Sequence, residues 1–157
     1  MAKRRKRTNV NVPAKGRLRD MADKLWSISV RSDWNWKCAV CNGSPCDAHH
    51  LIPRANEATR YDLQNGIALC ASHHQFCPDV SPHQNAAGWM AWLRVNQPLR
   101  HEWYVETVCN GGHLKFTGTK NAPYYCGRIM SFREYVEPEK FTEIVGMAFS
   151  EWLVKSP

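Results

Sequence analysis

Two pairs of metal-ligand residues constrain the fold of this chain more than any other feature of its sequence. Cys38 and Cys41 form a Cys-x2-Cys pair, and Cys70 and His73 form a second pair of the same spacing beyond a long loop. Zinc binds four tetrahedral ligands of the thiolate and imidazole type. One ion held by both pairs would close the loop and fix two short strands against a helix. We therefore expect a structural zinc site.

The same region holds alternative ligands. Cys46 could replace Cys41, and Cys77 could replace His73. A competing interpretation is that these cysteines are buried free thiols, which two matched pairs make unfavourable. The two remaining cysteines lie apart in the C-terminal third of the chain, where ordinary burial is expected.

Around the two pairs, the sequence predicts the order strand, loop, strand, helix. The strands are expected at 46–52 and 66–69, and the polar, irregular stretch 53–65 is expected to be the loop. The helix should begin near Cys70 and end before Pro78. This is the element order of a ββα-metal finger. Apolar residues at three- and four-residue spacing also predict flanking helices, over 16–32, 81–96 and 138–152.

The C-terminal part is expected to contain a hairpin. Residues 101–108 alternate loosely, and the turn signal Asn110-Gly111-Gly112 follows them. The expected fold is therefore α+β, with a zinc-stapled ββα-metal core, flanking helices and a C-terminal α/β extension. The expected domains are a disordered basic arm at 1–15, a core with its leading helix at 16–97, and the extension packed on that core at 98–157.

The positive charge of the chain is concentrated in its first residues. The 157 residues carry a net charge of +7, and residues 1–20 alone hold eight basic side chains against one acidic side chain. Such an arm binds polyphosphate because neutralising phosphates releases counterions. A solubilising tail or a nuclear-localisation signal is the alternative. The basic cluster consists of Lys3, Arg4, Arg5, Lys6 and Arg7.

Composition narrows the setting in which the chain works. No apolar run approaches the roughly 18 residues needed to span a bilayer, and the first residues lack the apolar segment of a signal peptide. Closely spaced Cys and His favour metal binding over disulfides in a reducing compartment. We expect a cytoplasmic protein with no membrane partner, and a monomer is favoured.

Adjacent histidines, His49 and His50, end the first expected strand. Hydrolysis of a phosphodiester needs a base of near-neutral pKa, and it needs positive charge at the phosphate and the leaving oxygen. His49 and His74 would share a divalent ion, and His50 would be the base. Asn65 would hydrogen-bond across the loop and fix the orientation of the His50 imidazole.

The run Ala48-His49-His50-Leu51-Ile52-Pro53, followed by Asn65 and by Leu69-Cys70-x2-His73-His74, resembles the HNH endonuclease family. The likeness is greatest to small phage-type members with an upstream zinc-binding Cys-x2-Cys, and it covers roughly residues 17–96. It implies a ββα-metal nuclease that cuts or nicks DNA with one catalytic metal. Its products would carry 5′-phosphate and 3′-hydroxyl ends.

The resemblance also implies the roles of single residues. His50 aligns with the base of the family, Asn65 with its central Asn, and His74 with its final metal-binding residue. His49 takes the place of a metal-binding Asp or His. Mg²⁺ is the expected catalytic ion, with Mn²⁺, Ni²⁺ or Zn²⁺ as alternatives. A phage-encoded enzyme of this kind would act in the host cytoplasm.

The chain departs from the family pattern after the last motif residue. Members with an all-histidine metal site often carry another His one helical turn later, where this chain has Pro78. The ion would then have two protein ligands plus water and phosphate, or Asp47 or Asp79 would contribute. In the loop, Arg54 or Arg60 is expected to contact a phosphate, with simple surface charge as the alternative.

The expected function is a metal-dependent DNA endonuclease or nickase of low sequence specificity. One alternative is a non-catalytic zinc-binding module that binds nucleic acid, in which the histidine pairs are structural. Another keeps the chemistry but changes the substrate to branched DNA or to RNA.

Overall fold

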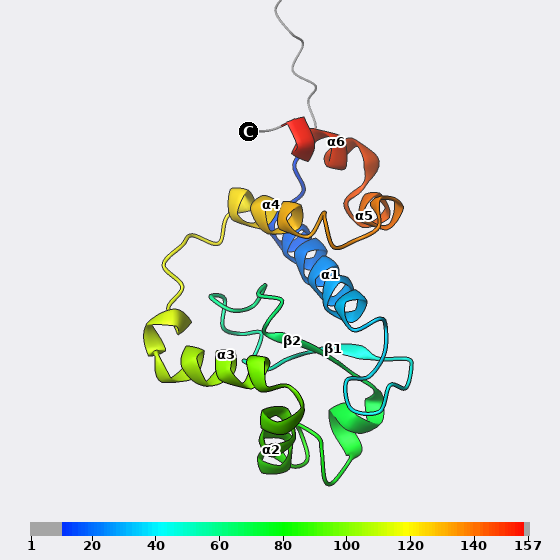
Figure 1. Cartoon of the computed structure of the whole chain (residues 1–157). Coiled ribbons are helices and arrows are strands. Elements are labelled where there is room, and N and C mark those ends of the chain that lie inside the picture. The colour runs from blue at the N-terminus through cyan, green and yellow to red at the C-terminus, as the bar shows by residue number, and fades with distance from the viewer. Residues whose placement is uncertain (1–10, 156–157) are drawn as a thin grey trace, which may run out of the picture.

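The computed structural model describes residues 11–155 of the chain (Figure 1). The basic cluster at positions 3–7, which is predicted to contact nucleic acid, lies outside the described residues. Residues 11–14 form no helix or strand.

A long helix, α1 (Lys15–Asp33), connects the two halves of the molecule (Figure 1). It contacts α4 and α5 on one side and both strands of the sheet on the other. Its apolar residues recur every three or four positions, and Leu18 and Leu25 are completely buried. The prediction of a helix over 16–32 is confirmed.

Strands β1 (Asp47–His50) and β2 (Gly66–Leu69) form a two-stranded antiparallel sheet. Asp47 pairs with Leu69 and His50 pairs with Gly66. A Cβ at Gly66 would collide with a Val30 methyl group, so glycine allows β2 to lie directly against α1. Both predicted strands are confirmed, although β1 is shorter than 46–52.

The element η1 (Ser72–Phe76) follows β2 and completes the strand, loop, strand, helix order. It is one short π-helical segment that lies inside the predicted range. Next, α2 (Ala86–Asn96) packs its buried Trp89 and Leu93 on residues of β2. The predicted helix start at Ser81 is wrong, because Asn85 caps α2 and accepts a hydrogen bond from the Gly88 N–H at 2.8 Å.

The hairpin predicted in the C-terminal part is wrong. Residues 98–109 form helix α3 (Pro98–Cys109), and Gly111–Leu114 forms the short 3₁₀ helix η2. Pro98 occupies the first turn of α3, where its fixed φ favours a helix and its missing N–H costs nothing. The helix packs against α2. The packing of α3 against α2 therefore outweighs the weak alternation of apolar and polar residues over 101–108.

Three further helices complete the chain: α4 (Ala122–Ser131), α5 (Pro138–Val145) and α6 (Met147–Lys155). They gather at the top of Figure 1, around the first half of α1. Gly146 has φ +83° and divides the single helix predicted over 138–152 into α5 and α6. Within the described residues the C-terminal extension is helical rather than α/β, and the sheet of the core makes the fold α+β.

Two apolar clusters stabilise the molecule. The larger one joins α1 to α4, α5 and α6 and includes Tyr61 from the loop between the strands. The smaller one joins β2, α2 and the completely buried Cys38. Across positions 11–155, no helix combines the length and the hydropathy needed to cross a bilayer.

Candidate active site

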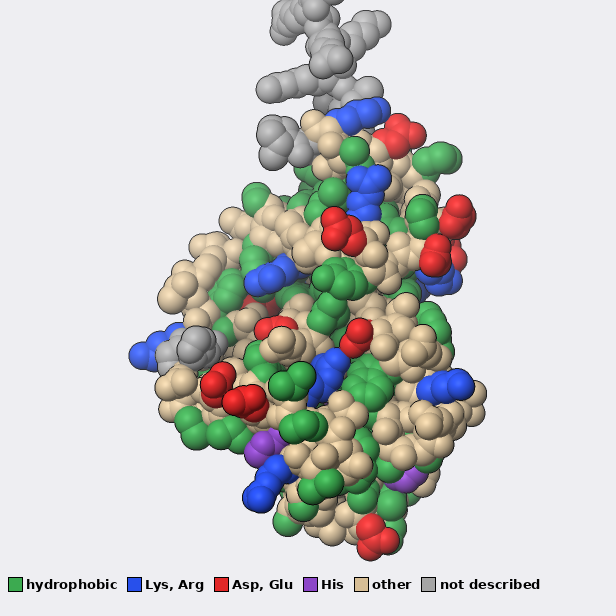
Figure 2. Space-filling model, in the orientation of Figure 1, with side chains coloured by type: hydrophobic (Ala, Val, Ile, Leu, Met, Phe, Trp, Pro, Cys, Tyr) green, Lys and Arg blue, Asp and Glu red, His purple; other side chains and the backbone are tan. Residues whose placement is uncertain are grey.

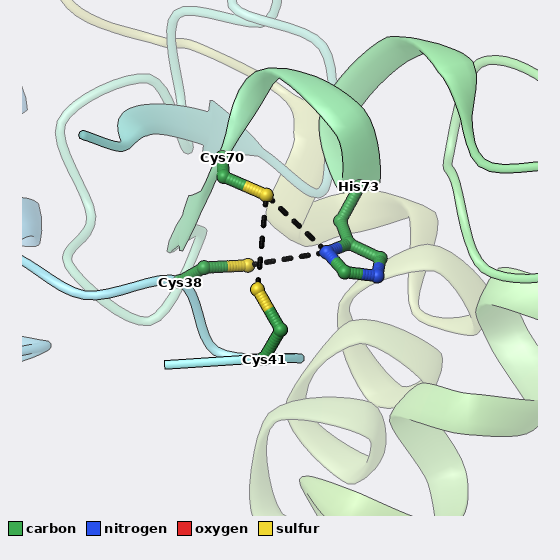
Figure 3. A group of neighbouring side chains, drawn as sticks. All are labelled: Cys38, Cys41, Cys70 and His73. Atoms are coloured by element: carbon green, nitrogen blue, oxygen red, sulfur yellow. Dashed lines mark hydrogen bonds between the residues drawn. The ribbon is translucent and has the colours of Figure 1, made fainter. Parts of the chain in front are cut away.

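The two predicted ligand pairs converge on one point. The side chains of Cys38, Cys41, Cys70 and His73 face one another between the loop after α1 and the start of η1 (Figure 3). The Sγ atoms of Cys41 and Cys70 are 3.9 Å apart, and His73 Nδ1 lies 3.7 Å from Cys38 Sγ and 3.3 Å from Cys70 Sγ.

These distances fit a tetrahedral zinc ion. Two thiolates at about 2.3 Å from one tetrahedral zinc ion lie about 3.8 Å apart, and a thiolate and an imidazole nitrogen at about 2.0 Å lie about 3.5 Å apart. Neither Cys46 nor Cys77, the alternative ligands, belongs to the group that the described residues form. The four side chains therefore have both the chemistry and the spacing for structural zinc.

Backbone hydrogen bonds shape the first half of this group. The Cys38 N–H donates to the Gly43 carbonyl, and the Asn42 N–H donates to the Cys38 carbonyl, both at 2.8 Å. Burial of the Cys38 thiol opposes its ionisation, but backbone hydrogen bonds, that from Cys70 first, outweigh this effect and lower the pKa of Cys38. A lowered pKa favours the thiolate, which is the form that binds metal.

A second group consists of three histidines. His49 on β1, His74 on η1 and His83 in the following loop place their ring nitrogens within 4.8 Å of one another. His49 Nδ1 and His74 Nε2 are 3.0 Å apart. His49 and His74 are thus close enough to share an ion, as the prediction requires, and His83 was not predicted to join them.

The sequence left open whether the ion would have two protein ligands plus water and phosphate, or a third from Asp47 or Asp79; in the structure the third side chain of the group is His83. It reaches the other two histidines because the loop after η1 turns back, held by a 2.9 Å hydrogen bond from Ser81 Oγ to the His74 carbonyl. Neither aspartate belongs to the group in the described residues. The sequence does place His83 nine positions after His74. The family pattern, however, pointed to a third histidine one helical turn after His74, where this chain has Pro78.

The electrostatics of this group favour metal binding. Burial lowers the pKa of His49 to about 3, and the neighbouring imidazoles of His74 and His83 contribute in the same direction. Burial also lowers the pKa of His74, with His83 as the second cause. Both rings are therefore neutral near pH 7, and neutral imidazole is the form that binds a metal ion.

His50 lies beside this group in a different environment. Its Nε2 is 2.9 Å from the Arg60 carbonyl oxygen. Because a carbonyl only accepts, Nε2 carries the proton, and Nδ1 keeps a free lone pair. Burial lowers the pKa of His50 to about 4, so the ring is neutral near pH 7 and can accept a proton. This is the state that a general base requires.

Asn65 holds the loop rather than the imidazole. It is completely buried, its Oδ1 accepts from the Ile52 N–H at 2.6 Å, and its Nδ2 donates to the Ile52 and Thr59 carbonyls at 3.0 Å. The predicted bond across the loop is present, but the partner that orients His50 is the Arg60 carbonyl. Asn65 therefore acts on His50 only through the conformation of the loop.

The two loop arginines differ. The Arg60 side chain is 4% exposed, and its guanidinium binds both carboxylate oxygens of Asp23, at 2.8 and 2.5 Å, and the Arg54 carbonyl at 2.6 Å. Arg54 or Arg60 was expected to contact phosphate, and three of the five Arg60 N–H groups are used inside the protein. Arg54 is exposed.

The three-histidine group, His50 and the loop arginines lie around one open cavity of about 520 Å³. The imidazoles of His49, His50, His74 and His83 line it together with Arg54 and Trp26. A neutral imidazole with a free ring nitrogen, a group of three convergent histidines and an exposed arginine therefore face the same space.

Comparison with known proteins identifies the central segment. Residues 38–76 match the family model of the HNH endonucleases. This match confirms the resemblance seen in the sequence, and it includes both Cys/His pairs, His49, His50, Asn65 and His74. Helix α1, His83 and everything after η1 lie outside it. Neither the curated proteins nor the solved structures gave a match to the chain.

Proposed function

We propose that this chain, which carries an HNH endonuclease segment at residues 38–76, is a metal-dependent DNA endonuclease or nickase. One observation carries the proposal: a neutral His50 with a free Nδ1 lies in the same cavity as three convergent imidazoles. Cleavage of supercoiled plasmid by the zinc-loaded protein, with and without added divalent metal, tests it.

The residues of the cavity have separate tasks in this reaction. His50 Nδ1 accepts a proton from the attacking water as the water oxygen bonds to phosphorus. The bond from phosphorus to the 3′ oxygen breaks, and that oxygen takes up a proton from solvent. Arg54 binds a non-bridging phosphate oxygen through its guanidinium. Asn65 keeps the loop closed so that the base stays in place.

His49, His74 and His83 would hold the catalytic ion, which supplies positive charge at the phosphate and the leaving oxygen. Mg²⁺ prefers oxygen ligands, whereas imidazole suits later divalent ions. The group offers three ring nitrogens and no carboxylate. We therefore rank Ni²⁺ and Zn²⁺ first, and Mn²⁺, the weakest binder of that series, below them but above Mg²⁺; this reverses the order expected from the sequence.

The wider setting follows the likeness to small phage-type members with an upstream zinc-binding Cys-x2-Cys. On that basis we propose a phage-encoded monomer that acts in the host cytoplasm with low sequence specificity. Residues 16–97 would be its nuclease core, and the helices of 98–157 would support that core.

Replacing His83 by alanine should weaken binding of Mn²⁺ to the zinc-loaded protein at least about tenfold, since even outer-shell partners of a ligand contribute roughly 10- to 100-fold to metal affinity. Isothermal titration calorimetry measures this affinity directly. His101→Ala, a change of the same kind on α3, should leave Mn²⁺ binding unchanged. Wild-type affinity in His83→Ala would show that His83 is not a ligand.

Deleting residues 1–10 should weaken binding to all duplex sequences and flatten its salt dependence. This deletion removes five basic residues and no acidic one, yet it leaves the first turn of α1 intact. On the face drawn in Figure 2, Lys and Arg are interspersed with Asp and Glu and form no continuous basic patch. The slope of log affinity against log salt should fall by roughly 0.9 for each phosphate that the shortened protein no longer neutralises, up to about 4.5.

Fluorescence anisotropy with two unrelated duplexes at several salt concentrations measures that slope. Equal slopes for the full-length and shortened proteins would assign the basic cluster to solubility or localisation instead.

A further inference from the structure

We propose that Asp23 and Trp26 of α1, which lie outside the segment that matches the family model, are the positioning residues of the base His50. The inference rests on the proposed function for the role of His50. It concerns how the imidazole is held, which the contacts of α1 with the catalytic loop define.

Trp26 fixes the face of the imidazole. The rings of Trp26 and His50 are stacked, with centroids 3.6 Å apart and an interplanar angle of 11°. The indole itself cannot withdraw, because it is 3% exposed and its Nε1 donates to the Asp62 carbonyl at 3.0 Å. Strand β2 also packs directly against the indole, since a Cβ at Gly66 would come within 3.0 Å of the indole ring. The stack therefore opposes any tilt of the His50 ring.

Asp23 fixes the edge of the imidazole through Arg60. The Arg60 carbonyl accepts the His50 Nε2–H, so the position of the backbone at residue 60 decides where that proton is held. Both Asp23 oxygens bind the Arg60 guanidinium, which is almost completely buried. The same guanidinium donates to the Arg54 carbonyl and so ties the loop to itself. Removing the Asp23 charge would leave a buried cation without this partner and release the loop.

The two constraints act together. Asp23 and Trp26 are three residues apart, so they project from the same side of α1 toward the cavity. One restrains the ring plane, and the other fixes the tautomer that leaves Nδ1 free. A misplacement of about 1 Å at a reacting group can cost on the order of 100-fold in rate. Helix α1 is therefore part of the active site and not only of the core.

Kinetics of three variants on plasmid DNA test the proposal. Trp26→Leu should lower kcat on the order of 100-fold and Asp23→Asn roughly tenfold, with KM little changed, because the base is misplaced while substrate binding is kept. Trp26→Phe, which retains an aromatic face, should recover most of the loss. The matched control is Asp33→Asn on the same helix: Asp33 binds Arg100, which holds the Leu63 and Gln64 carbonyls. The Asp33→Asn variant should keep wild-type kcat.

Proton–nitrogen NMR of the histidine rings gives a readout that does not need activity. Wild-type His50, assigned by its absence in His50→Gln, should show the single tautomer with the proton on Nε2. Trp26→Leu should remove the ring-current shift of its carbon-bound protons, and Asp23→Asn should yield mixed tautomers. If Trp26→Leu does not fold, Asp23→Asn decides alone.

Wild-type kcat together with unchanged His50 signals in these variants would overturn the positioning role while leaving the nuclease proposal intact. An inactive wild-type protein whose His50 signals respond as expected would instead overturn the nuclease proposal alone.

Discussion

Replacing His50 by alanine is expected to lower the rate of DNA cleavage about 100-fold or more, since positioned general bases contribute roughly 10²- to 10⁴-fold. The expectation rests on the free Nδ1 that the Arg60 carbonyl leaves on this ring and on its neutral state at pH 7. Single-turnover cleavage of supercoiled plasmid measures the rate.

Two companion measurements separate lost chemistry from lost structure. Zinc content and DNA affinity of His50→Ala should equal those of the wild type, because His50 belongs to neither ligand group. A correctly folded His50→Ala protein with full activity would remove His50 from the role of base.

Replacing Cys38 by serine is expected to remove the zinc and to destabilise the whole chain. Cys38 is completely buried between β2 and α2, and the ion would join the loop after α1 to η1. Structural zinc contributes about 10–16 kcal/mol of apparent binding free energy in zinc-finger peptides, which is comparable with the total stability of a typical domain of about 5–15 kcal/mol. The melting temperature should therefore fall by about 10 °C or more.

Metal analysis and thermal unfolding followed by circular dichroism test this expectation. The wild type should contain about one tightly held zinc per chain, given one Cys₃His site. Cys109→Ser changes an exposed thiol and should alter neither zinc content nor melting temperature. A stably folded, thiol-reduced wild-type protein without zinc would contradict the assignment of the four ligands.

The features that could be predicted from the sequence are those encoded at short range. Ligands three positions apart identify the Cys/His pairs, because the chemistry and the spacing occur together. Strand β2 is a short apolar run between turn signals, and α1 carries an apolar face of helical period. These signals placed the central unit and its leading helix correctly.

The features that were missed depend on contacts between residues with no periodic relation. His83 joins His49 and His74 only because Ser81 holds the intervening loop. The sequence around an arginine cannot separate a free guanidinium from a paired one, and the partner of Arg60 is 37 residues away. In α3 the loose alternation also fits a helix, and packing against α2 decides between the two.

A Mn²⁺ titration on supercoiled plasmid, with zinc-loaded wild-type protein, tests the central claim most directly. We predict no cleavage without Mn²⁺, and cleavage that saturates over the concentrations at which Mn²⁺ binds the three-histidine group. Mg²⁺ should be less effective, and His50→Ala should bind Mn²⁺ but not cleave. No cleavage of linear, nicked, branched or single-stranded DNA at any metal concentration would contradict the account. The chain would then be either a non-catalytic zinc-binding module that binds nucleic acid or a nuclease that acts on RNA.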